Sequence, residues 1–119
     1  MVQPVILLSE PYTVEAGTVH KVSCRATRSV PEGYTLLEQG MLYARDVAGL
    51  DENNFKEGTA GVNVARSTDT DPNGVMTLNV KVANDTIVVS FRGYMVVRND
   101  STGNESVWYT GVVSRSYNG

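Results

Sequence analysis

The chain has 119 residues, which is room for one domain, because single domains cluster near about 100–150 residues. Its net charge is −3, and no apolar run approaches the roughly 20 residues that a membrane-spanning helix needs. The weak, scattered negative charge offers no electrostatic footprint for DNA or RNA. Nucleic acid is therefore not an expected partner, and membrane insertion is not expected either.

The chain holds a single cysteine, Cys24, so an intrachain disulfide and metal sites with two or more thiolates are excluded. A lone cysteine fits a cytosolic protein and a bacterial surface module equally well. The stretch Met1–Leu8 lacks the basic region and the long apolar segment of a signal peptide. Either the protein stays inside the cell, or the chain is part of a larger exported protein.

The first third of the chain predicts short strands followed by a longer one. Val5–Leu8 and Tyr12–Val14 are apolar pieces separated by Pro11, which cannot donate to a strand ladder and belongs at an edge or a bend. From Val19–Ala26 apolar and polar residues alternate. This alternation predicts a half-buried strand with Cys24 on its inner side.

The middle of the chain is less regular. Tyr34–Ala44 predicts a further strand, but both of its faces carry apolar residues, so its inward face cannot be assigned. Arg45–Arg66 holds several glycines and a polar run at Asp51–Asn54. It predicts a loop with room for a turn of helix or a short edge strand such as Val62–Ala65.

The last part of the chain predicts a strand and then a long hairpin. Ser67–Gly74 is polar turn material, and Met76–Val82 alternates cleanly. Ile87–Val97 places apolar residues at every second position, which predicts a strand with one buried face. Asn99–Asn104 supplies turn residues, and Val107–Tyr109 resumes the strand pattern.

About seven strands without an amphipathic helix predict an all-β fold, an antiparallel β-sandwich. We expect one domain over residues 1–119, with its core at approximately residues 5–113.

Two strand motifs carry a resemblance to a known family. Leu37–Tyr43, with its Glu-x-Gly, and Phe91–Asn99, with its Arg-x-Tyr, followed by Val107–Tyr109, resemble fibronectin type III-like and immunoglobulin-like modules of bacterial cell-surface proteins of the Gram-positive type. The chain departs from that pattern at Gly93, where alanine is usual, and in the irregular segment around Asp51.

The resemblance implies a non-enzymatic module of a larger surface or secreted bacterial protein, acting as a spacer or as a protein-interaction or adhesion unit. It implies an extracellular or cell-surface location, no cofactor, neighbouring domains, and a protein or glycan as partner. Such modules share no binding site, so it specifies no ligand. The alternatives are a carbohydrate-binding module and a virion structural or decoration domain.

One turn resembles the opening of a calcium loop. Asp69, Asp71 and Asn73 alternate as oxygen ligands do in such loops. The twelfth position is Val80 rather than a bidentate glutamate, and Pro72 restricts the backbone. We therefore expect these side chains to bond neighbouring backbone amides and not to hold calcium tightly.

Three aromatic residues are candidates for partner contact: Tyr94, Trp108 and Tyr109. Trp108 and Tyr109 are neighbours on a strand, so they face opposite sides. An exposed ring would offer a stacking surface to a sugar or a protein. Packing in the sandwich core is the favoured interpretation for Trp108.

No catalytic group is predicted. The only histidine, His20, is expected to be a solvated surface residue, and Cys24 is expected to point inward. Adjacent acids such as Asp51 and Glu52 are typical of a solvated loop. The sequence therefore favours a protein that works through its surface rather than an enzyme.

Overall fold

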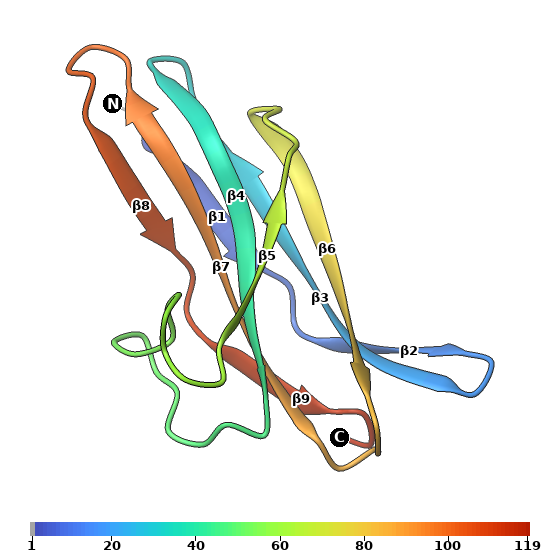
Figure 1. Ribbon diagram of the computed structural model, residues 1–119. Coiled ribbons are helices and arrows are strands. Elements are labelled where there is room, and N and C mark those ends of the chain that lie inside the picture. The colour runs from blue at the N-terminus through green and yellow to red at the C-terminus, as the bar shows by residue number, and fades with distance from the viewer. Residues whose placement is uncertain (1) are drawn as a thin grey trace.

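The computed structural model describes residues 2–119, which form strands, turns and loops without a helix (Figure 1). The strands are β1 (Val5–Leu8), β2 (Tyr12–Ala16), β3 (Val19–Ser29), β4 (Tyr34–Arg45), β5 (Asn63–Ser67), β6 (Asn73–Val82), β7 (Val88–Asn99), β8 (Glu105–Tyr109) and β9 (Val113–Ser116). No helix of these residues is long and apolar enough to cross a membrane.

The first sheet is built around β3. Strand β6 pairs with β3 along residues 20–29, while β1 and β2 pair with it one after the other. The two short strands must share the other edge, since β6 occupies one edge over that length. Pro11 lies at the break between them, which is the edge position that the sequence predicts.

The second sheet is built around β7 in the same way. Strand β4 pairs with one edge, β8 and β9 pair in succession with the other, and β5 lies beyond β4. At the break between β8 and β9, the Thr110 N–H donates to the Gly93 carbonyl at 2.9 Å. The Thr110 Oγ1 accepts the Gly93 N–H at 2.8 Å, so its side chain continues the ladder.

The two antiparallel sheets pack face to face and confirm the all-β sandwich. Side chains from both inner faces form the main core: Ile6, Val22, Cys24, Ala26, Val30, Leu36, Met41, Val80, Val89, Phe91, Met95 and Val97. Cys24 is fully buried, as the alternation in β3 predicts. The described residues form nine strands rather than about seven; β9 was not predicted, and β5 was expected only as an option.

A β-bulge explains why the inward face of β4 could not be assigned from the sequence. Leu36 pairs with Val97 but Glu38 pairs with Val96, so Leu37 is an extra residue in the strand. The alternation therefore reverses at the bulge. Leu36 and Met41 both pack in the main core, although their spacing in an unbroken strand would place them on opposite faces.

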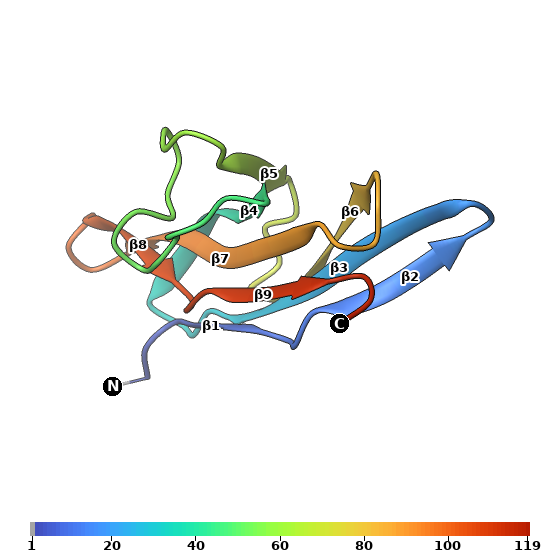
Figure 2. The same ribbon diagram turned by 90° about the horizontal axis from the view of Figure 1, so that it is seen from below.

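A second apolar cluster lies outside the second sheet, where residues 46–62 fold back over it. Figure 2 shows this loop on the side of β4 and β7 that is turned away from the first sheet. Its fully buried Phe55 packs with Leu42, Ala44 and Tyr94. The expectation that β7 buries only one face is thus wrong, because Ser90, Arg92 and Tyr94 are also buried.

The molecule is elongated, with extents of 49 × 28 × 21 Å. Its radius of gyration is 15.1 Å, against about 13.5 Å for an average compact domain of this length. Strand β1 begins near one end of the molecule, and β9 ends toward the other, short of the β2–β3 hairpin, which reaches further (Figures 1 and 2).

Candidate functional site

A groove on the outer face of the second sheet combines apolar and aromatic walls with charged side chains and is the candidate site. It has a volume of about 140 Å³, and its walls come from β4, β7, β8 and the loop between β4 and β5. The lining residues are Glu38, Leu42, Glu57, Tyr94, Val96, Val107 and Tyr109. Apolar and aromatic walls with two carboxylates at the rim are a typical composition for a binding groove.

The floor of the groove depends on a glycine. Gly40 pairs with Tyr94 across β4 and β7, and the Tyr94 ring lies over it. A Cβ atom at Gly40 would lie 2.5 Å from the Tyr94 ring and 2.6 Å from the Ala65 carbonyl oxygen. The absence of a side chain at Gly40 lets the Tyr94 hydroxyl reach Glu38, to which it donates a hydrogen bond.

The electrostatics of the groove centre on Glu38, Glu57 and Arg66. Arg66 forms an ion pair with Glu57 and lies 3.5 Å from the Glu38 carboxylate. Burial, and then the hydrogen bond to Glu38, raise the pKa of Tyr94 far above its ordinary value. Tyr94 therefore stays a neutral donor, and it fixes the Glu38 carboxylate at the rim.

Arg92 attaches the covering loop to the sheet beside the groove. Its Nε donates to the Thr110 carbonyl at 2.9 Å, and its Nη1 donates to the carbonyls of Glu52 at 2.9 Å and Phe55 at 3.0 Å. The guanidinium carbon lies 4.2 Å from the centre of the Tyr109 ring. These contacts, formed by a buried side chain, hold the loop that carries Glu57.

The structure brings two of the three aromatic candidates together. Tyr94 and Tyr109 line the groove, with ring centroids 6.4 Å apart, and Tyr109 is 44% exposed. Trp108 lies on the opposite face of β8, where its partly buried ring packs against the main core. It is therefore no part of the groove.

In the calcium-like turn, residues 69–73, the acidic side chains already bond to other groups of the same chain. The Asp69 carboxylate accepts the Asp71 N–H at 2.9 Å, and the Asp71 carboxylate accepts the Asn73 N–H at 3.0 Å. Asp69 also forms an ion pair at 3.1 Å with the buried Arg28, whose Nε donates to the Asp71 carbonyl. Within residues 2–119 no group of three His, Cys, Asp or Glu side chains is arranged to hold a metal ion.

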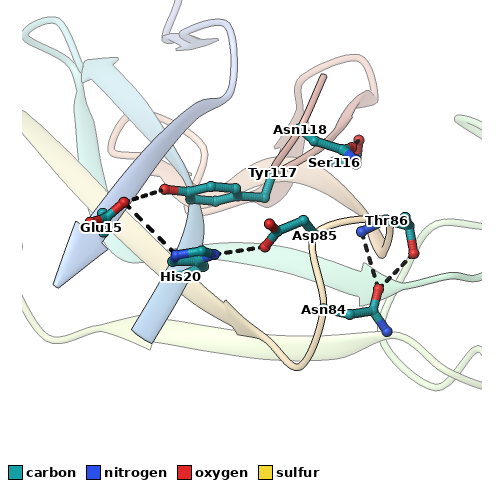
Figure 3. A network of polar contacts seen from close by, with 8 residues as sticks. All are labelled: Glu15, His20, Asn84, Asp85, Thr86, Ser116, Tyr117 and Asn118. Atoms are coloured by element: carbon teal, nitrogen blue, oxygen red, sulfur yellow. Dashed lines mark hydrogen bonds and ion pairs between the residues drawn. The ribbon is translucent and has the colours of Figure 1, made fainter. Parts of the chain in front are cut away.

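His20 belongs to a polar network rather than standing alone in solvent (Figure 3). Its Nδ1 lies 2.7 Å from an Asp85 oxygen, and its Nε2 lies 3.8 Å from Glu15. Its ring stacks on Tyr117 with centroids 4.1 Å apart, and the Tyr117 hydroxyl donates to Glu15. His20 lies at the surface with its side chain 31% exposed, but the last residues of the chain fold back over one face of its ring.

This network is not arranged as a nucleophile with its base. Both ring nitrogens of His20 face carboxylates, and neither faces a hydroxyl or a thiol. Cys24 follows four residues later on β3, about 13 Å further along an extended strand. The Cys24 thiol is buried and donates to the Ser9 carbonyl at 3.4 Å. The His20 network connects β2, β3, the turn after β6 and the end of the chain.

Sequence reasoning did not assign Glu38, Glu57 or Arg66 to a site. The available signal lay in the two strand motifs, because Glu38 and Gly40 of the first meet Tyr94 of the second. Glu57 and Arg66 carry no comparable signal, since a covering loop and a short edge strand bring them to the groove.

Comparison of the chain with known protein families, curated proteins and solved structures gives no significant match.

Proposed function

We propose that this chain is a non-enzymatic module of a larger surface or secreted protein and acts as a spacer and protein-interaction unit. The observation that carries the proposal is the elongated shape of the domain, 49 Å in its longest extent, with β1 beginning near one end and β9 ending toward the other (Figure 1). A module with that geometry separates whatever precedes it from whatever follows it. The groove between the poles then offers a surface for a partner.

We further propose that the sandwich is of the immunoglobulin or fibronectin type III kind. The strand order supports this, with β1/β2, β3 and β6 in one sheet and β5, β4, β7 and β8/β9 in the other. The pairing of β5 with β4 rather than β6 matches the sheet extension of variable-type immunoglobulin domains. The convergence of Glu38, Gly40 and Tyr94 gives the two resembling motifs a shared structural role.

A carbohydrate-binding module is the second candidate. It is favoured by Tyr109, an exposed ring beside the carboxylates of Glu38 and Glu57, because sugars bind through aromatic stacking together with hydrogen bonds to carboxylates. The Arg92 guanidinium over the Tyr109 ring weighs against it, since it takes up ring surface.

Two measurements test the proposal. Two copies fused head to tail should give, by small-angle X-ray scattering, an extended particle about twice as long as the 49 Å domain. A compact fused pair would contradict the spacer role. On a glycan array the domain should show no strong binding, and strong binding that Tyr109→Ala abolishes without unfolding would establish the carbohydrate-binding alternative.

A further inference from the structure

The longest strand edge without a partner belongs to β6. This strand has ten residues, whereas the other strands at the sheet edges have four or five. Among the described residues β6 pairs with β3 alone, in a register without a bulge, and Figure 1 shows it at the margin of the first sheet. It contains no proline, and its single charged residue, Lys81, lies near one end. The edge therefore lacks the features that usually protect a strand against further pairing.

The hydrogen-bond pattern shows which backbone groups of β6 face the open edge. The Val30 N–H donates to the Pro72 carbonyl at 2.8 Å, which makes these two residues a hydrogen-bonded pair at the start of the β3–β6 ladder. Such pairs alternate with non-hydrogen-bonded pairs in an antiparallel ladder, so the backbone groups of Met76 and Leu78 face β3. The backbone groups that face the open edge are those of Val75, Thr77 and Asn79.

Other groups of the chain close this free stretch at both ends. At one end the Arg45 Nε donates to the Lys81 carbonyl at 2.9 Å. At the other end the Asn73 N–H donates to the Asp71 carboxylate at 3.0 Å. Thr77 lies at the centre of the stretch between them. Two antiparallel copies of β6 can use all of the free backbone groups only when Thr77 lies opposite its own counterpart.

The apolar side of β6 is incompletely covered along the same margin. Met76 and Leu78 pack against the main core, but both remain partly exposed. Their neighbours on β3, Ala26 and Cys24, are fully buried, so the exposure arises on the side of the open edge. With Thr77 opposite its counterpart, Met76 of each copy lies opposite Leu78 of the other. This contact would remove from water the apolar surface that a single chain leaves uncovered.

The charges along β6 agree with a second copy as the partner. Lys81 lies opposite Lys21 in the β3–β6 ladder, so two like charges are neighbours within one chain. In the register centred on Thr77, the second copy places Asn73 opposite Lys81, with Asp71 two residues before it. Asp71 has no ion pair among the described residues. The pairing thus brings a carboxylate toward Lys81 at both ends and sets no like charges opposite each other.

We propose that the chain forms a two-fold symmetric dimer, in which the β6 strands of two copies pair antiparallel with Thr77 on the axis. The open edge supplies the backbone hydrogen bonds, and Met76 and Leu78 supply the apolar contact. A second copy carries the free backbone stretch and the partly exposed apolar residues in the matching register. The inference goes beyond the proposed function: the two first sheets join into one continuous sheet, and the groove on each second sheet stays open to a further partner.

The first test needs only the unmodified domain. Sedimentation equilibrium from about 10 μM to about 1 mM should show a monomer that gives way to a dimer. Amide exchange measured by NMR should slow at Val75, Thr77 and Asn79 as the concentration rises. The amides of Met76 and Leu78 should exchange slowly at every concentration, because they donate to β3 within one chain.

Matched variants test the register. Thr77 is exposed in the single chain, so Thr77→Lys and Thr77→Glu keep the fold, but each places two like charges opposite each other on the axis and should weaken the dimer. An equimolar mixture of the two variants brings opposite charges together and should form a dimer about tenfold tighter than either variant alone. Thr27→Lys is the control. It adds the same charge at an exposed position on the same face of β3, where no residue of the second copy lies opposite, and should leave the dissociation constant unchanged.

Four outcomes would overturn the inference. These are a monomer at every concentration up to about 1 mM, a dimer that Thr77→Lys leaves unchanged, a mixture no tighter than its components, and concentration-dependent protection of amides outside residues 75–79. The Thr77→Lys variant also provides a single chain in which the extended shape of the fused copies can be measured. The dimer and the spacer role can therefore fail independently of each other.

Discussion

The guanidinium of Arg92 lies 4.2 Å from the centre of the Tyr109 ring while it donates to three backbone carbonyls. One side chain thus joins β7, the break after β8 and the loop over the second sheet. The groove between Tyr109 and that loop exists because this anchor holds both of its walls.

Replacing Arg92 by lysine should release the loop. Lysine keeps the charge but lacks the planar fork that reaches several carbonyls, so we expect the free energy of unfolding in urea to fall by about 3 kcal/mol. Amide exchange over residues 46–62 should accelerate. Arg98→Lys is the matched control, since its ion pair with Asp100 is exposed and should change stability by about 0.5 kcal/mol or less. Equal effects of the two substitutions would refute the anchoring role.

Tyr94 should not ionise in the native protein near its ordinary pKa of 10.0, because burial and Glu38 raise the pKa of its hydroxyl. Tyrosinate absorbance at alkaline pH should therefore rise equally in the wild type and in Tyr94→Phe. In denaturant, where all six tyrosines of the wild type can ionise, the variant should lack the tyrosinate absorbance of one of them. Because the pKa of Tyr94 is higher in the folded state than in the unfolded state, its contribution to the free energy of unfolding is complete below pH 10.0. That contribution is lost as the pH rises above 10.0. A weaker native signal in the variant near pH 10.0 would show that Tyr94 is accessible.

Asp69 should contribute stability that acid removes. The Asp71 N–H and the Arg28 guanidinium lower the pKa of Asp69 below its ordinary 3.8. The folded state then binds fewer protons than the unfolded state, so the contribution is present above pH 3.8 and is lost as the pH falls through the lowered pKa. Asp69→Asn should reduce the urea midpoint at neutral pH, and the difference should shrink below pH 3.8. A constant difference across that range would contradict the prediction.

The same turn should not gain stability from calcium, because its carboxylates already accept backbone N–H groups and pair with Arg28. Thermal melts with calcium and with chelator should coincide. A ligand at a hundred times its dissociation constant adds about 2.7 kcal/mol, so tight binding would shift the melt by several degrees.

Cys24 should react slowly with thiol reagents in the native protein. It is fully buried, and burial raises the pKa of its thiol. Labelling should become fast only in denaturant. A Cys24→Ala, Arg25→Cys double variant moves the thiol to the exposed face of β3 and should label rapidly while folded. Fast labelling of the wild type would mean that β3 opens locally or is shifted in register.

The strands predicted most clearly from the sequence are those that bury one face and expose the other. The alternation of β3 and β6 is visible because apolar residues occupy every second position. In β4 the bulge at Leu37 breaks that period, and no local signal marks the extra residue. In β7 the outer face is covered by a loop whose apolar residues, such as Phe55, follow no period.

The candidate site was predictable only in fragments. Tyr94 and Tyr109 were named because an exposed ring on a strand offers a stacking surface, but their neighbours depend on the pairing of strands far apart in sequence. Glu38 meets Tyr94 only in the register set by the bulge, and Glu57 arrives on the covering loop. Trp108 and Tyr109 were separated correctly by strand geometry, although the choice between inward and outward required the register of β8.

The placement of the two ends has a mechanical consequence. Strand β1 runs from one pole into the domain, and β9 runs out toward the other (Figure 1). A pull along the long axis would therefore slide β1 along β3 and β9 along β7, so that the bonds of each strand share the load rather than open one at a time. Before β9 could slip, the Asn118 N–H would have to leave the Asp85 carbonyl and the Tyr117 ring would have to leave the His20 ring, so these two contacts resist tension ahead of β9.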